Sequence, residues 1–227
     1  MSFDVSENEV FGIIGLNGAG KSSIIKILMG LTQADEGIAL LNGQASKNTT
    51  GKRSLGYLPE NPCLYPNLTL KEHLNFACQV GEIKASERGE RIKRAISQVD
   101  LHNVENTPIR QFSKGMTQRA ALAYALIHTP SILILDEPMS GLDPLGRQLI
   151  IKIIEECKNR GTTILFCSHI LTDVERICDR IGIMHQGKLM STTTPLQLSE
   201  FKTDNSTGIA RTPLEMYFLK TIGRGEL

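Results

Sequence analysis

The sequence has 227 residues, of which 41% are hydrophobic and 22% charged, so it is long enough for one large α/β domain or for one domain with a subdomain. Its formal net charge of +1 argues against a strongly basic surface, and we expect no nucleic-acid partner. No hydrophobic run approaches the roughly 20 residues that cross a bilayer, and the N-terminal residues lack the pattern of a signal peptide. We therefore expect a soluble, cytoplasmic protein whose five scattered cysteines are reduced.

The first element is a short continuous hydrophobic run, EVFGIIG (9–15), which is typical of a strand buried on both faces of a parallel sheet. It leads into GLNGAGKSS (15–23), which fits the phosphate-loop pattern G-x-x-x-x-G-K-[ST] and is followed by a helical segment. The glycines let backbone N–H groups surround phosphate oxygens, Lys21 can reach the terminal phosphates, and the Ser22 hydroxyl can bind Mg²⁺. The candidate nucleotide-binding residues are Gly15, Leu16, Asn17, Gly18, Ala19, Gly20, Lys21, Ser22 and Ser23.

The segment 69–126 contains no convincing strand, and we interpret it as a mainly helical subdomain inserted between two strands of the sheet. Thr69 and Glu72 at its start have the spacing of a capping box. Near its end, QFSKGMTQRAALAYAL (111–126) places Ser113 and a glycine before an alanine-rich helix. A helix start is an anion site, because its free N–H groups and positive dipole end point outward. The chain therefore carries two candidate anion sites.

The run SILILDEP (131–138) predicts a second buried strand that ends in Asp136 and Glu137. The carboxyl end of a strand in an open α/β sheet is where ligands bind. Asp136 can hold Mg²⁺ through its water shell, while Glu137, which points in another direction, can act as the general base on the attacking water. The alternative is a strand that merely ends at the surface, and the phosphate loop favours the functional interpretation.

Asp143 and Pro144 follow, in SGLDPLGRQL (140–149), as a good N-cap and first-turn proline. Capping explains both residues locally, whereas a functional role needs Asp143 near a nucleotide across an interface, and spacing alone does not choose between the two. The third hydrophobic run, TTILFCSH (162–169), ends in His169. A lone strand-end histidine is more often structural than catalytic, but beside the acidic strand His169 could hydrogen-bond the γ-phosphate and orient the water.

The sequence 180–190 then predicts a hairpin with a Gln-Gly turn, and KTDNSTG (202–208) is polar enough for a flexible loop.

The ordered motifs GLNGAGKS (15–22), FSKGM (112–116), LILDEP (133–138), SGLD (140–143) and SH (168–169) resemble the ATP-binding subunits of ABC transporters. In that family they are the Walker A, signature, Walker B, D-loop and switch-histidine motifs. The resemblance covers nearly the whole chain. The stretch GYLPENPCLYPNLTLKEHL, the SKGM variant and the tail TPLEMYFLKTIG are similar to subunits that serve ABC-2 type exporters.

The resemblance implies a P-loop NTPase fold of the α/β class. Its parts would be a RecA-like core with a mainly parallel sheet (1–67 and 127–200), an inserted helical subdomain (68–126), a small, N-terminally shortened antiparallel β part and a tail (201–227). It implies two ATP-binding subunits, identical or different, that meet head to tail. Residues of one chain would then contact the ATP of its partner: Ser113, Lys114, Gly115, Met116 and Asp143. ATP with Mg²⁺ would drive an integral membrane permease, an ABC-2-like exporter, from the cytoplasmic face of the membrane.

Two departures from the family pattern matter. The family usually has a glutamine that contacts Mg²⁺ after the strand leading into the helical subdomain, and Glu60 stands at the matching place here. A glutamate can also approach Mg²⁺ but adds negative charge near the triphosphate. Family members usually also carry an N-terminal aromatic residue that stacks on adenine, and neither Phe3 nor Phe11 matches it. We therefore expect either that the N-terminus is truncated or that ATP is bound with little base contact.

Two other functions compete with the transporter subunit. A soluble ABC ATPase acting on ribosomes or DNA usually has two cassettes or a long coiled coil, and this chain has one cassette and no heptads. A degenerate cassette would bind nucleotide and hardly turn it over. The architecture favours the transporter subunit.

Overall fold

The computed structural model describes residues 1–48, 52, 54–199 and 211–223. Its centre is a six-stranded sheet in the order β4-β5-β6-β1-β7-β8, in which only the β7–β8 pair is antiparallel. The strands are β1 (Val10–Ile14), β4 (Leu55–Leu58), β5 (Ile132–Asp136), β6 (Thr163–Ser168), β7 (Arg180–His185) and β8 (Lys188–Thr193). The three hydrophobic runs thus form β1, β5 and β6, and the expectation of an α/β fold with a mainly parallel sheet is confirmed.

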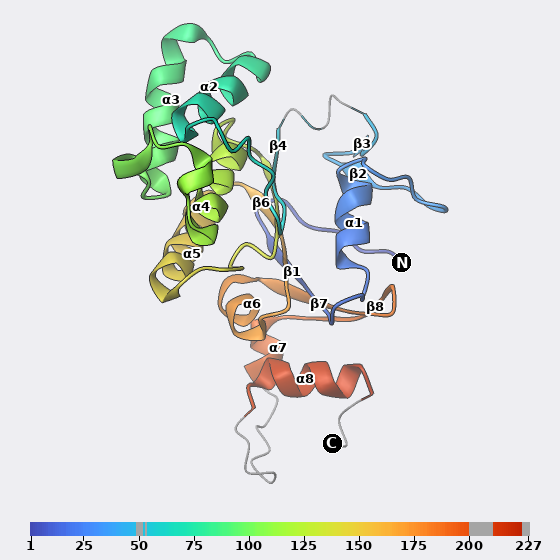
Figure 1. Cartoon of the computed structure of the whole chain (residues 1–227). Coiled ribbons are helices and arrows are strands. Elements are labelled where there is room, and N and C mark those ends of the chain that lie inside the picture. The colour runs from blue at the N-terminus through green and yellow to red at the C-terminus, as the bar shows by residue number, and fades with distance from the viewer. Residues whose placement is uncertain (49–51, 53, 200–210, 224–227) are drawn as a thin grey trace.

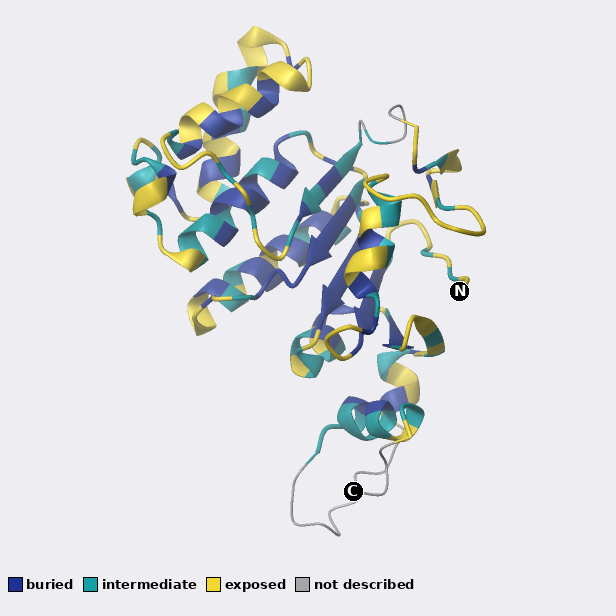
Figure 2. Cartoon of the chain, turned by 45° about the vertical axis from the view of Figure 1, so that its right-hand side comes forward, coloured by how far each residue is buried: buried dark blue, intermediate teal, exposed yellow. Residues whose placement is uncertain are grey.

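Helices cover both faces of this sheet (Figure 1). On one face α1 (Lys21–Leu28) packs on Phe11 and Ile13, and on the other α5 (Pro144–Asn159) and α6 (Leu171–Ile177) share a larger core with Val10 and Ile14. Successive residues of β1 therefore enter opposite cores, as the alternation of side chains along a strand requires. Figure 2 shows the strands as the most buried part of the chain.

The predicted helical segment contains three α-helices and two short 3₁₀ helices that pack on one another beside β4 (Figure 1). They are α2 (Leu70–Val80), α3 (Ala85–Gln98), η2 (His102–Val104), η3 (Ile109–Gln111) and α4 (Lys114–Leu126). The Thr69 side chain accepts a hydrogen bond from the Glu72 N–H at 3.2 Å, and the Glu72 carboxylate accepts one from the Thr69 N–H at 2.8 Å. The capping box predicted from the sequence is therefore confirmed.

Two hairpins have tight turns with successive positive φ values, and the sequence analysis predicted the second of them, at Gln186 and Gly187. The strands β7 and β8 turn at Gln186 and Gly187, with φ of 48° and 77°, and the short strands β2 (Leu40–Leu41) and β3 (Gln44–Ala45) turn at Asn42 and Gly43, with φ of 49° and 74°. Two successive positive φ values are typical of the type I′ turn that matches the twist of paired strands. The β2–β3 pair is the small antiparallel part.

The C-terminal part adds α7 (Pro195–Ser199) and α8 (Pro213–Thr221), which pack together and, through α8, on α6. The polar loop predicted at 202–208 lies outside the described residues. All five cysteines are free thiols, and only Cys63 is exposed. Within 1–48, 52, 54–199 and 211–223, no helix combines the length and hydrophobicity needed to cross a membrane.

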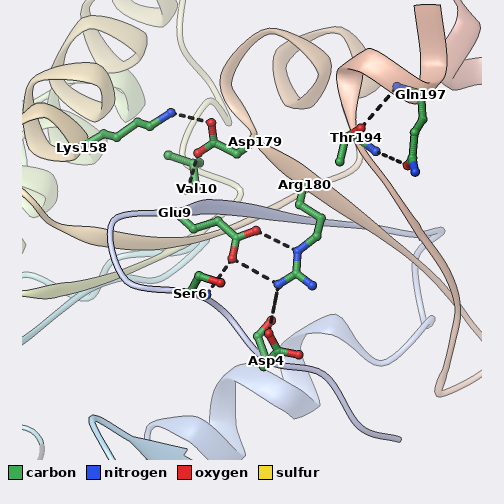
Figure 3. Close-up of polar contacts among 9 residues, drawn as sticks. All are labelled: Asp4, Ser6, Glu9, Val10, Lys158, Asp179, Arg180, Thr194 and Gln197. Carbon is green, nitrogen blue, oxygen red and sulfur yellow. Dashed lines mark hydrogen bonds and ion pairs between the residues drawn. The ribbon is translucent and has the colours of Figure 1, made fainter. Parts of the chain in front are cut away.

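A partly buried ion pair between Glu9 and Arg180 joins the start of β1 to the start of β7 (Figure 3). The Arg180 guanidinium donates to both carboxylate oxygens of Glu9, at 2.8 and 3.1 Å, and lies 4.7 Å from the centre of the Phe11 ring. The hydrogen bonds to Glu9 raise the pKa of Arg180 above its usual value. Phe11 is fully buried in the core, and the partly buried Phe3 stacks on it.

This ion pair should contribute measurably to stability, because Glu9 is only 11% exposed and its bond to arginine is bidentate. We expect Glu9→Gln to lower the free energy of unfolding by about 1–2 kcal/mol in urea denaturation. The control Glu105→Gln breaks the exposed Lys71–Glu105 pair, at 3.7 Å, and should cost less than about 0.5 kcal/mol. Equal losses in the two variants would contradict this account.

Candidate functional site

The phosphate loop connects the carboxyl end of β1 to the start of α1. Gly18 and Gly20 have φ of 79° and 104°, a region that favours glycine, and Ala19 N–H closes a turn on the Leu16 carbonyl at 3.0 Å. A Cβ built on Gly18 would have no neighbour within 4 Å, so this side of the loop is open. Gly20 is the N-cap of α1 and provides no side-chain cap, which leaves the helix start available to an anion.

Lys21 lies inside this loop. Its side chain is largely buried, at 8% exposed, and its ammonium group donates to the Gly15 carbonyl oxygen at 2.6 Å. A second, longer contact reaches the Leu16 carbonyl at 3.5 Å. A buried ammonium needs anionic partners, and these two carbonyls supply only partial negative charge. The loop therefore presents a preplaced cation to any anion that enters it.

Two buried carboxylates stand at the carboxyl end of β5, where Asp136 is 6% and Glu137 7% exposed. The pKa of Asp136 is raised to about 6, first by burial and then by the negative charges of Glu137 and Glu60, while Lys21 acts in the opposite direction. Glu60, which follows β4, thus lies close enough to act electrostatically on Asp136. An excess of buried negative charge next to Lys21 favours a bound cation.

Glu137 has a strained backbone and a fixed side chain. Its φ of 49° lies in the left-handed region, which a residue other than glycine rarely adopts, and its N–H donates to the Cys167 carbonyl at 2.9 Å. Such strain is common at functional sites, where the surrounding structure maintains it. Because the backbone turns here, Glu137 and Asp136 present their carboxylates in different directions.

His169 contacts Glu137 directly. Its Nδ1 lies 2.8 Å from Oε2 of Glu137, and the same oxygen accepts a hydrogen bond from the Ser168 hydroxyl at 3.3 Å. The structure therefore pairs His169 with the proposed base, a contact that the sequence analysis did not predict. Ser168 is fully buried and was missed as a site residue, although its place before a strand-end histidine could have drawn attention to it.

The second candidate anion site lies at the start of α4. Ser113 is the N-cap, and its hydroxyl accepts a hydrogen bond from Met116 N–H at 3.2 Å. Lys114 extends over Gly141 and donates to the Ser140 hydroxyl at 3.2 Å, so the FSKGM and SGLD segments adjoin each other. A Cβ on Gly115 would lie 3.3 Å from the Gly141 carbonyl oxygen.

Figure 1 shows α4 and α1 on opposite sides of the sheet, so the start of α4 is not part of the phosphate loop of its own chain. Asp143 caps α5, because its Oδ1 accepts a hydrogen bond from Gly146 N–H at 2.8 Å. The capping alternative therefore describes Asp143 within one chain, and its functional alternative still requires a second chain.

Comparison with known proteins places these features in a family. The sequence profile described as "ABC transporter" matches residues 1–140. An uncharacterised ABC transporter ATP-binding protein of Nostoc sp. is 46% identical over 191 residues, which are 83% of this chain and 57% of that protein. The lantibiotic transport ATP-binding protein SrtF of Streptococcus pyogenes is 38% identical over 190 residues, 84% of this chain and 81% of that one.

A solved structure, described as the ATP-binding subunit of an ABC transporter, is also similar. Its TM-score is 0.85 at 32% identity, and the likeness covers 97% of this chain and 90% of the other. The P-loop NTPase fold expected from the sequence is thereby confirmed. The chain spans only about half the length of the cyanobacterial relatives that it matches. Since the profile covers well over half of its sequence, the chain belongs to the ABC transporter family, among the ATP-binding proteins.

Proposed function

We propose that this chain is the subunit of an ABC transporter that binds and hydrolyses ATP. The observation that carries the proposal is the row of charged groups at one edge of the sheet, where a buried lysine after β1 faces buried carboxylates after β5. Residues 15–23 would hold the triphosphate through backbone N–H groups, with Lys21 at the terminal phosphates. The division into a core, a helical subdomain (68–126) and a tail (201–227) is part of this proposal.

Mg²⁺ fits the donor groups at this edge. The Ser22 hydroxyl and the carboxylates of Asp136 and Glu60 supply the oxygen ligands that Mg²⁺ prefers. Burial first, and then the negative charges of Glu137 and Glu60, raise the pKa of Asp136, and a bound cation would favour its ionised form. The described residues contain no group of three or more acidic, histidine or cysteine side chains able to hold a metal alone. We propose a metal that is shared with substrate phosphates, where it would neutralise developing charge.

Glu137 is the proposed general base. Its Oε2 is held by His169 and Ser168, so the carboxylate is fixed in place to accept the proton of the attacking water. His169 is 58% exposed and can also reach toward the γ-phosphate, as the sequence analysis proposes. The two roles of His169 are compatible, because an imidazole has two ring nitrogens and Nδ1 alone contacts Glu137.

A second ATP-binding subunit, identical or different, would complete each site. The start of α4 lies away from the phosphate loop of its own chain, so Ser113, Lys114, Gly115 and Met116 are available to the triphosphate of a partner. Asp143 lies in the segment adjoining Lys114 and would approach the same interface. Binding of two ATP molecules then selects the closed dimer, and hydrolysis releases it.

The permease partner is proposed to dock near the loop that follows β4. A hollow of about 220 Å³ lies there, and its lining includes Tyr57, Tyr65, Phe76 and Tyr124. Pro59 and Pro62 flank Glu60 in this lining, so a partner seated in the hollow would touch the segment proposed to reach Mg²⁺. We propose an ABC-2-like exporter, which the similarity to SrtF supports, with this subunit cytoplasmic and held at the inner face of the membrane by its permease.

Replacement of the proposed base should separate binding from turnover. We expect Glu137→Gln to bind ATP like the parent chain, to lose at least about 100-fold in phosphate release, and to accumulate as an ATP-bound dimer in gel filtration. The matched control Glu156→Gln alters an exposed pair on α5 and should keep the parent rate. Parent-level hydrolysis by Glu137→Gln would remove Glu137 as the base.

A negative charge at the start of α4 should block the partner's nucleotide. In the Glu137→Gln background, we expect Gly115→Glu to leave ATP binding to the monomer intact and to abolish ATP-dependent dimers in gel filtration, because the carboxylate would repel the triphosphate. Gly89→Glu makes the same substitution at an open position of α3 and serves as the control. Undiminished dimer formation by the Gly115 variant would contradict the head-to-tail arrangement.

The buried Asp136 carboxylate should make the nucleotide-free protein less stable as pH rises. Its folded pKa of about 6 exceeds the unfolded value of 3.8, so the folded state is penalised progressively as pH rises through this interval. We expect Asp136→Asn, without nucleotide and with EDTA, to raise the free energy of unfolding by about 1–3 kcal/mol at pH 8 and by nothing measurable below pH about 4.

The control for this pH dependence is Asp35→Asn, in an exposed loop, which should change stability by less than about 0.5 kcal/mol at both pH values. A gain from Asp136→Asn that is equal at pH 8 and pH 4 would show that charge burial is not its cause.

A further inference from the structure

The tip of the β7–β8 hairpin lies directly against the phosphate loop. Gly187 N–H, in the turn of the hairpin, donates to the Ala19 carbonyl oxygen at 2.9 Å. Figure 1 shows the blue loop that precedes α1 beside the turn between β7 and β8. These two segments are more than 160 residues apart in the sequence. The phosphate loop is therefore supported from one side by a second tight turn.

Met184 makes the closest approach from the hairpin. Its side chain is 2% exposed and belongs to the core layer that also contains Ala19 and Ile25 of the α1 region. A Cβ on Gly20 would lie 2.7 Å from the Met184 Cε, and a Cβ on Gly15 would lie 2.5 Å from its carbonyl oxygen. A side chain at Gly15 would thus collide with the backbone of Met184, and one at Gly20 would have to displace the end of the Met184 side chain.

The glycines of the phosphate loop therefore differ in what surrounds them. Gly15 and Gly20 face Met184, whereas a Cβ on Gly18 would have free space around it. In the usual explanation of the motif the glycines make room for phosphate. Here two of the three make room for the hairpin, and Gly18 remains on the open side. Gly20 is also the left-handed N-cap of α1, so its packing partner influences where the helix start points.

A bulge in the hairpin sets the position of Met184. The pairing changes from Ile183 opposite Ser191 to Met184 opposite Leu189, so β8 contains one extra residue at this point. Bulges increase the local twist and redirect the following residues. The bulge immediately precedes Met184, and the tight turn at Gln186 and Gly187 follows, so both features act on the part of the hairpin that touches the loop.

We propose that Met184 and the turn at Gly187 position the phosphate loop for the triphosphate, with Met184 as a positioning residue that never touches the nucleotide. The inference rests on the proposed function. Met184 fills the space beneath Gly20 and Gly187 fixes Ala19, so the N–H groups at the start of α1 and the Lys21 ammonium stay aligned. Without these contacts the phosphate loop would become ordered only when the nucleotide binds. The conformational entropy lost in that ordering would weaken binding.

The first experiment compares Met184→Ala with a matched cavity elsewhere. Ile153→Ala removes a side chain that is 1% exposed from α5, on the other face of the sheet. Urea denaturation gives the loss of stability of each variant without nucleotide, and titration calorimetry gives its dissociation constant for MgATP. We expect Met184→Ala to raise the dissociation constant and KM about tenfold with kcat within twofold, and both Met184→Leu and Ile153→Ala to stay within twofold of the parent.

The second experiment disturbs the turn without opening a cavity. Gly187→Ala and Gly43→Ala introduce the same methyl group at the same turn position, with φ of 77° and 74° and no atom within 4 Å of the new Cβ. The strain is alike in the two turns, but only Gly187 donates to the phosphate loop. We expect Gly187→Ala to weaken MgATP binding at least threefold and Gly43→Ala to leave it within the error of the measurement.

The outcomes are distinct. Equal weakening of MgATP binding by Met184→Ala and Ile153→Ala would reduce the effect to a general loss of stability and overturn the inference. A lower kcat at unchanged KM would also overturn it. If Met184→Ala does not fold, the pair of glycine variants decides alone. Absence of MgATP binding by the parent chain contradicts the proposed function and this inference together, whereas parent-like binding by Met184→Ala and Gly187→Ala overturns only the inference.

Discussion

The constraint on which this structure depends is the burial of opposite charges at one edge of a hydrophobic sheet. Lys21 lies beyond the end of β1 and Asp136 is the last residue of β5, and among the described residues neither has a full counter-charge bonded to it. An isolated buried charge is costly, so the arrangement is most stable when an anion meets the lysine and a cation meets the carboxylates. A magnesium–triphosphate complex supplies both at once. The hydrophobic core that stabilises the sheet thus also buries the charged groups, and their burial favours binding of a magnesium–triphosphate complex.

The strand order brings these charged groups together at one end of the sheet. Between β5 and β1 runs β6, with Cys167 opposite Asp136 and Ser168 opposite Ile14. The carboxyl ends of these three parallel strands therefore place the acidic pair, the Ser168–His169 step and the phosphate loop side by side. Each of these strands continues as hydrophobic core on both faces, which leaves their ends as the place where polar groups gather.

The sequence alone predicts those features that depend on a few neighbouring residues. The phosphate loop, the capping box at Thr69 and the Gln186–Gly187 turn follow from local spacing and backbone preference, and each is found where expected. Local spacing could not predict the contact between His169 and Glu137. It depends on how β5 and β6 align in the sheet, and a helix separates these two strands in the sequence. The approach of Met184 to Gly20 requires, in addition, a bulge, and one extra residue in a strand leaves no clear periodic signal.

The contacts between FSKGM and SGLD bear on why one chain would be insufficient. Ser140 N–H donates to the Glu137 carbonyl at 3.0 Å, and the Ser140 hydroxyl accepts from Lys114 at 3.2 Å. The proposed base and the start of α4 are thus connected through a single residue, although they would serve different nucleotides in the proposed dimer. A shift of α4 toward a partner's triphosphate would act on Ser140, and through it on the strained turn at Glu137. Binding at one site of the dimer would in this way bias the geometry of the other, with no need for a longer path between them.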